Sequence, residues 1–181
     1  FRKEEGAIHQ KTSHASPTPL HAGGRLYVHF GHDGTAALDA ADGAVLWTQT
    51  SLPYPPVHGN GGSPVLHGDK LIFACDGASD PFVVALHAKD GSVAWKTLRN
   101  VVVKSTFSFS TPLIVEVSGQ AQAVVPGSGA VVAYDPEDGR EIWRYGYGEG
   151  YSVVPRPLHR DGVVYVCSGF GRAVLHAVRT D

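Results

Sequence analysis

The chain has 181 residues and a nearly balanced charge, with 15 Lys and Arg against 17 Asp and Glu. This balance excludes the basic footprint of a nucleic-acid-binding protein, and no apolar run approaches the roughly 18 residues of a membrane-spanning helix. The sequence has no methionine, even at position 1, so we expect the natural start codon and any leader peptide to lie outside it.

Short β-strands joined by tight turns are predicted along the whole chain. In the first unit, Leu20 and 25–30 flank one turn, and 35–38 and 44–47 flank a second turn at Asp42-Gly43. Two short β runs around an Asp-Gly turn are typical of a hairpin. The same pair of hairpins is predicted in a second and a third unit, and the first hairpin begins again at Leu158.

The predicted hairpins repeat at a fixed interval. The Asp-Gly pairs and the tryptophans that follow them recur every 48 residues, at Trp47, Trp95 and Trp143. A proline precedes the first strand of each unit, at Pro19, Pro64, Pro112 and Pro157. No segment sustains a period of 3.6 residues, so no helix is predicted.

Four short antiparallel strands in about 48 residues are the signature of a propeller blade. We therefore predict an all-β fold: a partial β-propeller of about three and a half four-stranded blades, forming part of a single domain over 1–181. The predicted blades cover 15–48, 61–97, 109–145 and an incomplete 154–181. A helical solenoid does not fit the β pattern, and a β-sandwich would not keep this register.

The segments 37–47, 85–95 and 133–143 resemble the repeat A-x-D-x-x-T-G-x-x-x-W of quinoprotein, or PQQ-like, propellers. His87 replaces the repeat aspartate in the second copy, and Asp stands for the usual Thr in all three. The family includes quinone-dependent alcohol dehydrogenases, the non-enzymatic outer-membrane assembly lipoprotein of the Bam complex, and many exported proteins of this repeat type. The chain looks most like the last group, and the resemblance implies a periplasmic or otherwise exported location.

The resemblance also implies that Trp47, Trp95 and Trp143 are structural residues that dock between adjacent blades. A large ring at one place in every blade is a packing device. Since propellers close with typically 4–8 blades, we expect the chain to be a fragment whose terminal surfaces are covered by the missing blades of its parent.

The loops on one face of the predicted propeller are chemically rich, whereas the turns on the other face are short and monotonous. Binding residues concentrate on loops held by a rigid frame. The alternative is that these glycine-rich loops only pack around a narrow central channel. The candidate binding residues, expected near the axis on this face, are His58, Asn60, Asp76, Asp80, Glu149, Tyr151 and Arg156.

Arg156 stands where the other units have Thr18, Ser63 and Thr111. A long cation in place of small hydroxyl residues suggests a charge partner, either Glu149 or a ligand carboxylate. The alternative is that Arg156 only caps loop carbonyls.

Residue types alone favour metal and cofactor binding. In the resembling dehydrogenases a Glu, an Asn and an Asp hold Ca²⁺ beside the quinone, and Glu149, Asn60 and Asp76 have the right types. The adjacent Cys-Cys pair and the C-x-x-C-H haem motif of those enzymes are absent, and we predict that Cys75 and Cys167 are not bonded to each other. No metal and no cofactor are expected, with PQQ and Ca²⁺ as the alternative.

His29 and His32 suggest zinc, but no third and fourth ligand follow at metal spacing. We expect both histidines to have structural or solvent-facing roles.

The sequence favours a non-catalytic binding or scaffold propeller that recognises a protein or carbohydrate through the variable loop face. The alternative is a fragment of a pyrroloquinoline-quinone-dependent dehydrogenase. A third hypothesis is an accessory propeller of a larger signalling chain. Catalytic residues stay unassigned, because no hydrolase, metalloprotease or nucleotide-binding signature occurs.

Overall fold

A computed structural model describes residues 10, 13, 15–170 and 173–180. The described chain is almost entirely β-strand. Sheet 1 contains β1 (Leu20–Ala22), β2 (Arg25–His29), β3 (Thr35–Asp39) and β4 (Val45–Gln49), and sheet 2 contains β5 (Val65–His67), β6 (Lys70–Cys75), β7 (Phe82–His87) and β8 (Val93–Leu98). Sheet 3 contains β9 (Leu113–Val117), β10 (Gln120–Pro126), β11 (Ala130–Tyr134) and β12 (Glu141–Gly146), and sheet 4 contains β13 (Leu158–Arg160), β14 (Val163–Cys167) and β15 (Leu175–Arg179).

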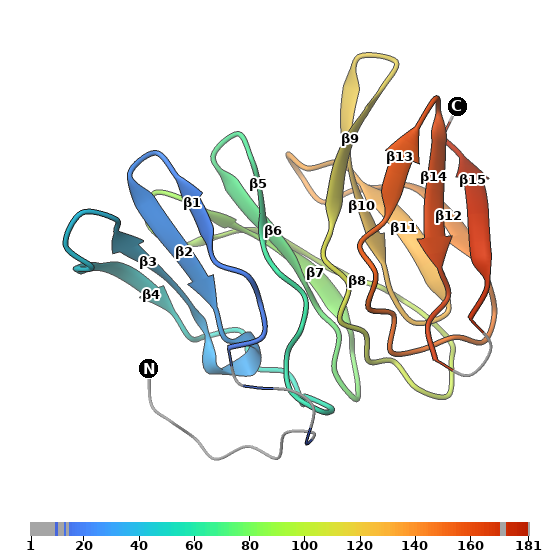
Figure 1. Ribbon diagram of the computed structural model, residues 1–181, viewed down its shortest axis with the longest axis horizontal. Helices are drawn as coiled ribbons and strands as arrows, with labels where there is room; N and C mark the ends of the chain where they lie inside the picture. The colour runs from blue at the N-terminus through green and yellow to red at the C-terminus, as the bar shows by residue number, and fades with distance from the viewer. Residues whose placement is uncertain (1–9, 11–12, 14, 171–172, 181) are drawn as a thin grey trace.

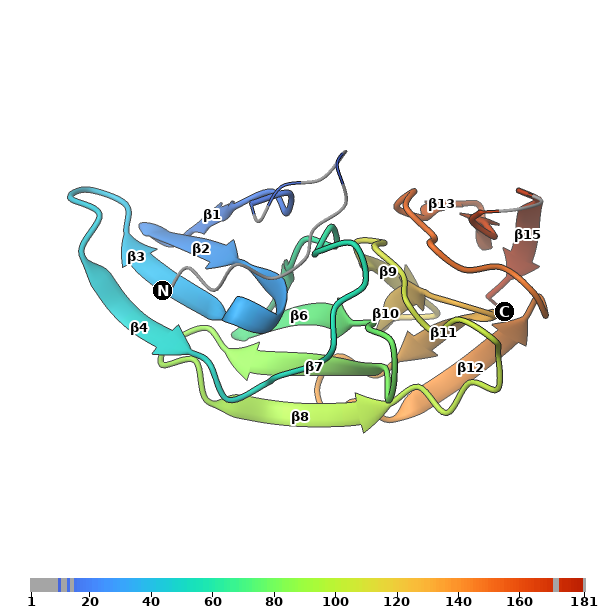
Figure 2. The same ribbon diagram turned by 90° about the horizontal axis from the view of Figure 1, so that it is seen from below.

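The four sheets stand side by side in an open arc (Figures 1 and 2). Within each sheet the strands pair antiparallel in chain order, so every connection is a hairpin. Figure 2 shows β4, β8 and β12 along the convex side of the arc, with β1 and β13 on the opposite side. The predicted all-β partial propeller is confirmed.

One detail differs from the strand-only expectation. A single 3₁₀ turn, η1 (Gly31–Asp33), lies between β2 and β3. None of the described residues forms a helix with the length and hydropathy needed to cross a membrane.

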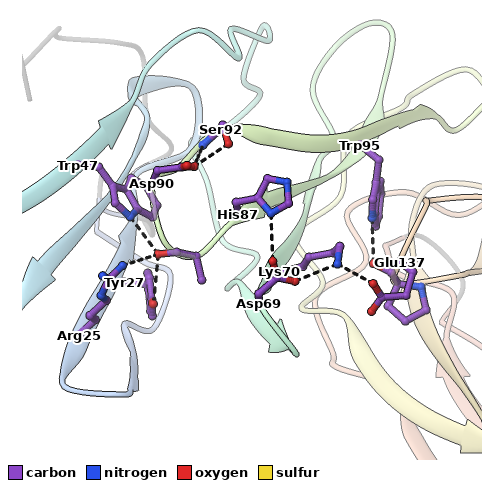
Figure 3. Close-up of polar contacts among 12 residues, drawn as sticks. Arg25, Tyr27, Trp47, Asp69, Lys70, His87, Asp90, Ser92, Trp95 and Glu137 are labelled. Atoms are coloured by element: carbon purple, nitrogen blue, oxygen red, sulfur yellow. Dashed lines mark hydrogen bonds and ion pairs between the residues drawn. The ribbon is translucent and has the colours of Figure 1, made fainter.

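The aspartates of the repeat shape the turns between the third and fourth strands. The Asp39 carboxylate accepts the Ala41 N–H at 2.8 Å, and the Asp42 carboxylate accepts the Ala44 N–H at 2.8 Å. Asx turns of this kind satisfy backbone donors that leave the ladder. His87, which replaces the first of these aspartates in sheet 2, instead shares a hydrogen bond with Asp69 (Nδ1 to Oδ2, 3.2 Å; Figure 3).

Trp47 joins sheet 1 to sheet 2, and Trp95 joins sheet 2 to sheet 3. The indole N–H of Trp47 donates to Ala88 O at 3.1 Å, and that of Trp95 donates to Pro136 O at 2.9 Å (Figure 3). Both acceptors lie in the third-to-fourth-strand turn of the following sheet. The rings are 8% and 7% exposed, so each contact combines apolar burial with a satisfied buried donor.

The glycine of the receiving turn makes room for the ring. A Cβ on Gly91 would lie 2.5 Å from Trp47, and a Cβ on Gly139 would also collide with Trp95. Gly43 has the same left-handed backbone, with φ of +77°, but no atom lies within 4 Å of its Cβ position. The Asp-Gly turn therefore serves both as a tight turn and as a seat for the preceding tryptophan.

Trp143 is only partly buried and donates its indole N–H to Gln122 Oε1 of its own sheet at 2.7 Å. Its ring packs against the apolar cluster between sheets 3 and 4, so Trp143 lies at a boundary between sheets but donates its hydrogen bond within its own sheet.

Apolar clusters fill the three boundaries between sheets. Tyr27 and Trp47 of sheet 1 pack with Leu71, Phe73 and Val84 of sheet 2. Further clusters join sheet 2 to sheet 3 and sheet 3 to sheet 4. Cys75 and Cys167 are both free, which confirms the prediction that they do not pair.

Gly91→Ala is expected to cost more stability than Gly43→Ala. Both substitutions place a Cβ at a positive φ, which costs roughly 1 kcal/mol. Only Gly91→Ala must also displace Trp47, and overpacking of this kind adds roughly 1–3 kcal/mol. Urea denaturation of the two variants measures the difference, and equal losses of stability would show that the tryptophan does not depend on the glycine.

Candidate functional site

The loops that join one sheet to the next lie at one end of the strands, together with the connections between the second and third strands of each sheet. The other hairpin turns lie at the opposite end (Figure 1). We call the first of these ends the loop face. It consists of the segments 30–34, 50–64, 76–81, 99–112, 127–129, 147–157 and 168–170. Unusual backbone geometry is common there, since His58, Asp80, Asn100 and Ser152 have φ between +47° and +66°. Left-handed residues other than glycine are uncommon and often accompany functional loops.

A row of aromatic rings crosses the loop face. Ring centroids lie 5.4 Å apart for His58 and Phe107, 5.2 Å for Phe107 and Tyr151, and 5.7 Å for Tyr151 and Phe170. The four residues come from four different loops. We call this row the aromatic strip.

Backbone contacts hold these loops together. The Ser152 N–H donates to Phe107 O at 2.9 Å, and the Phe170 N–H donates to Tyr151 O at 2.8 Å. A Cβ on Gly150 would collide with Ser168 O, and a Cβ on Gly169 would collide with Tyr151 O. These glycines therefore allow the close backbone approach that brings the rings together.

A cavity of about 630 Å³ adjoins one end of the strip, within the usual size range of ligand pockets. Phe170 is 68% exposed and Val102 is fully exposed. Lys104 and Glu149 are exposed as well, and neither forms an ion pair within the described part of the chain. The cavity is lined by Val102, Val103, Lys104, Ser105, Ser128, Gly148, Glu149, Gly150, Tyr151 and Phe170.

A second hollow, which we call the inner groove, runs along the starts of the first strands and has a volume of about 520 Å³. Hydroxyl groups link successive sheets there: the Thr18 N–H donates to Ser63 Oγ at 2.8 Å, and the Ser63 N–H donates to Thr111 Oγ1 at 3.0 Å. Arg156 donates from Nε to Pro112 O at 3.2 Å. The lining residues include one cation and no carboxylate: Thr18, Pro19, Leu20, Ser63, Pro64, Val65, Leu66, Thr111, Ile114 and Arg156.

The candidate binding residues predicted from the sequence lie in separate parts of the structure. His58, Glu149 and Tyr151 belong to the aromatic strip or its cavity. Arg156 lies in the inner groove, and it forms no ion pair with Glu149 among the described residues. The contact to Pro112 O corresponds to the carbonyl-capping alternative.

Asn60 is buried against the turn between β2 and β3 of sheet 1. Its Oδ1 accepts a hydrogen bond from Tyr54 Oη at 3.1 Å, and a Cβ on Gly31 would lie 2.6 Å from the Asn60 Cβ. The side chain therefore packs between two loops. Asp80, by contrast, is exposed on the loop after β6.

Asp76 is buried beside Arg99, which is 1% exposed. The Arg99 Nε and the Asp76 Oδ1 are 3.6 Å apart, a separation longer than a hydrogen bond. The Arg99 guanidinium also donates to Val125 O at 3.0 Å, which links sheets 2 and 3. Burial raises the pKa of Asp76 to about 6, and the charge of Arg99 opposes this shift only in part.

The proposed calcium ligands do not fit a calcium site. The Asp76 carboxylate already faces the buried Arg99 cation, and Asn60 is bonded to Tyr54. Glu149 lines a cavity that neither Asn60 nor Asp76 lines. Among the described residues, no group of three or more His, Cys, Asp or Glu side chains is placed to hold a metal ion.

His29 and His32 also have separate surroundings. His29 is buried and its Nδ1 shares a hydrogen bond with the Thr35 hydroxyl at 2.9 Å, and burial lowers its pKa to about 3. His32 lies 3.4 Å from the Asp33 carboxylate. These contacts give both histidines local partners.

The sequence reasoning did not single out Arg99, Phe107 or Phe170. Phe107 and Phe170 lie in loops rather than strands. An aromatic side chain within a glycine- and serine-rich loop was the sequence signal that could have indicated them as binding residues. Nothing local to Arg99 indicates burial, since its partners Asp76 and Val125 are distant in the sequence.

Comparisons with known proteins give two groups of similar proteins. The profile of a family described as outer membrane protein assembly factor BamB, a PQQ-repeat family, matches residues 3–101 and 79–180. The quinoprotein ethanol dehydrogenase of Pseudomonas aeruginosa is 32% identical over 146 residues, covering 71% of this chain and 22% of that protein. The chain thus spans about a fifth of the length of this curated relative.

Solved structures share the fold at low sequence identity. BamB from Moraxella catarrhalis aligns with a TM-score of 0.58 and 19% identity, over 85% of this chain and 43% of that one. A europium-containing methanol dehydrogenase aligns with a TM-score of 0.61 and 15% identity, over 90% and 41% of the two chains.

Asp76→Asn is expected to gain stability relative to the wild type as the pH rises. A pKa raised from 3.8 to about 6 means that the folded chain binds the proton more tightly than the unfolded chain. The wild type therefore loses free energy of unfolding between about pH 4 and pH 6, by up to roughly 3 kcal/mol, and the variant does not.

Denaturation midpoints at pH 4.5 and pH 7.5 measure this difference, with Asp80→Asn as a matched control on the same loop. The control is expected to keep the pH dependence of the wild type. If Asp76→Asn instead loses stability relative to the wild type at the higher pH, the attraction of Arg99 outweighs the cost of burying the carboxylate.

Proposed function

Because the chain belongs to the PQQ-repeat family described as outer membrane protein assembly factor BamB, we propose that it is a non-catalytic binding or scaffold propeller. The aromatic strip and its adjoining cavity carry this proposal. They form the binding surface for a protein or carbohydrate partner.

The composition of the strip supports a binding role. Aromatic side chains are enriched at the centres of protein interfaces, and exposed apolar patches mark interaction sites. Phe170 and Val102 expose apolar surface beside the charged Glu149 and Lys104. The surrounding sheets supply the rigid frame on which loop residues keep a fixed geometry.

The family description supports an exported, periplasmic location for this chain, since it names an outer-membrane assembly factor. A nucleic-acid partner is disfavoured by the balanced charge.

Further blades are proposed as partners of sheet 4. Leu158 pairs with Tyr165 across β13 and β14, just as Leu20 pairs with Tyr27 in sheet 1. Tyr27 is buried against sheet 2, whereas Tyr165 and Leu158 are 36% and 71% exposed. A following blade would cover this apolar face.

The second candidate function is that of a fragment of a pyrroloquinoline-quinone-dependent dehydrogenase. The identity to quinoprotein ethanol dehydrogenase favours it. The inner groove is lined by the Arg156 cation and by hydroxyl groups, and its lining residues include no carboxylate. This lining suits an anionic ligand. The poor fit of Asn60, Asp76 and Glu149 to Ca²⁺ argues against it.

Tyr151→Ala and Phe170→Ala are expected to weaken partner binding by about tenfold or more, as truncation of an aromatic anchor does. Labelled chain and variants are applied to arrays of peptides and of glycans, and the affinities of the bound probes are compared. Tyr145→Ala, which truncates a partly exposed tyrosine of β12 outside the strip, is expected to bind like the wild type. Equal binding by all variants would show that the aromatic strip does not bind the partner.

Titration with pyrroloquinoline quinone and Ca²⁺ separates the two candidate functions. The chain is expected to show no saturable binding and no dye-linked alcohol oxidation, because the calcium ligand set does not fit. Binding that is abolished by Arg156→Ala, together with alcohol oxidation, would establish the dehydrogenase function instead.

A further inference from the structure

We infer that the occupant of the aromatic strip and its cavity is an extended polypeptide segment, with an apolar anchor residue in the cavity and charged residues of opposite sign on either side. This inference rests on the proposed binding function. It specifies the class of partner and the chemistry that the strip recognises.

The angles between the rings favour a compact apolar side chain over a flat sugar ring. Tyr151 is inclined by 67° to Phe107 and by 52° to Phe170. Rings inclined in this way do not form one flat stacking platform. Val102 and Val103 complete the lining with aliphatic groups, which match an aliphatic or aromatic side chain.

The charges beside the cavity point to a partner that carries both signs. Lys104 and Glu149 are exposed at the same cavity, and within the described part of the chain neither forms an ion pair with the other or with a third residue. A polypeptide can offer a basic residue to Glu149 and an acidic residue to Lys104, whereas a neutral glycan offers neither. Charges at the rim of a binding surface select partners through such complementarity.

The length of the strip favours a segment over a single amino acid. The rings continue from the cavity through Phe107 to His58, over loops that precede sheets 2, 3 and 4. An extended peptide advances about 3.3 Å per residue, so several residues are needed to follow four rings. One anchor in a pocket with weaker contacts on each side is a common pattern of peptide recognition.

The inference is tested by selecting peptides from a random seven-residue phage-display library on the 181-residue chain. Enriched peptides are expected to share a central Leu, Ile, Phe or Tyr, with Lys or Arg on one side and Asp or Glu on the other. Synthetic peptides of the enriched sequence are then titrated by fluorescence anisotropy. Phe170→Ala is expected to lower their affinity about tenfold or more.

Charge reversal distinguishes the two flanking contacts. Selection on Glu149→Lys is expected to replace the basic flanking residue by an acidic one, and selection on Lys104→Glu to replace the acidic residue by a basic one. Glu116→Lys is the matched control, because Glu116 is an exposed carboxylate in β9, outside the strip. It should leave the enriched sequence unchanged.

Three results would overturn the inference. The first is the absence of an enriched motif, and the second is a motif that is unaffected by both charge reversals. The third is selective binding of a glycan that is lost in Tyr151→Ala, and this result would leave the proposed binding function intact. Failure of every peptide and glycan to bind would overturn the proposed function together with the inference.

Discussion

The contact that Trp47 and Trp95 each make with the turn of the following sheet is the constraint on which the rest of the molecule depends. A propeller sheet cannot bury both faces alone, so its neighbours must be held at a fixed distance and angle. Trp47 and Trp95 do this by inserting a ring over a glycine and donating to a carbonyl in the same turn. The hydrogen bond fixes the orientation of the indole ring, which apolar packing alone would leave undetermined.

This docking at the hairpin end positions the loops at the other end of the strands. The aromatic strip joins loops from successive sheets, and its rings can meet only while those sheets keep their spacing. Glycines act at both ends for the same physical reason, because Gly91 admits Trp47 and Gly150 admits the backbone of Ser168. The frame and the candidate site are thus parts of one packing arrangement.

The fold was predictable from the sequence because each copy of the repeat contains the local residues that determine its turns and strands. The Asp-Gly turn, the tryptophan four residues later and the proline before each first strand are local signals, and they recur in register. The candidate site was predictable only in part. His58, Tyr151 and Glu149 lie at the strip or its cavity, but the burial of Asp76 beside Arg99 depends on contacts between distant segments. Residue type alone could not separate a ligand carboxylate from a buried ion pair.

The central claim is that docked tryptophans hold the aromatic strip together. Nuclear Overhauser effects between the ring protons of His58 and Phe107 test it most directly, measured in the wild type and in Trp95→Leu, which loosens sheet 2 from sheet 3. The account predicts clear cross-peaks in the wild type and their loss in the variant, while the amide signals of the strands persist. Cross-peaks absent from the wild type, or unchanged in Trp95→Leu, would contradict it.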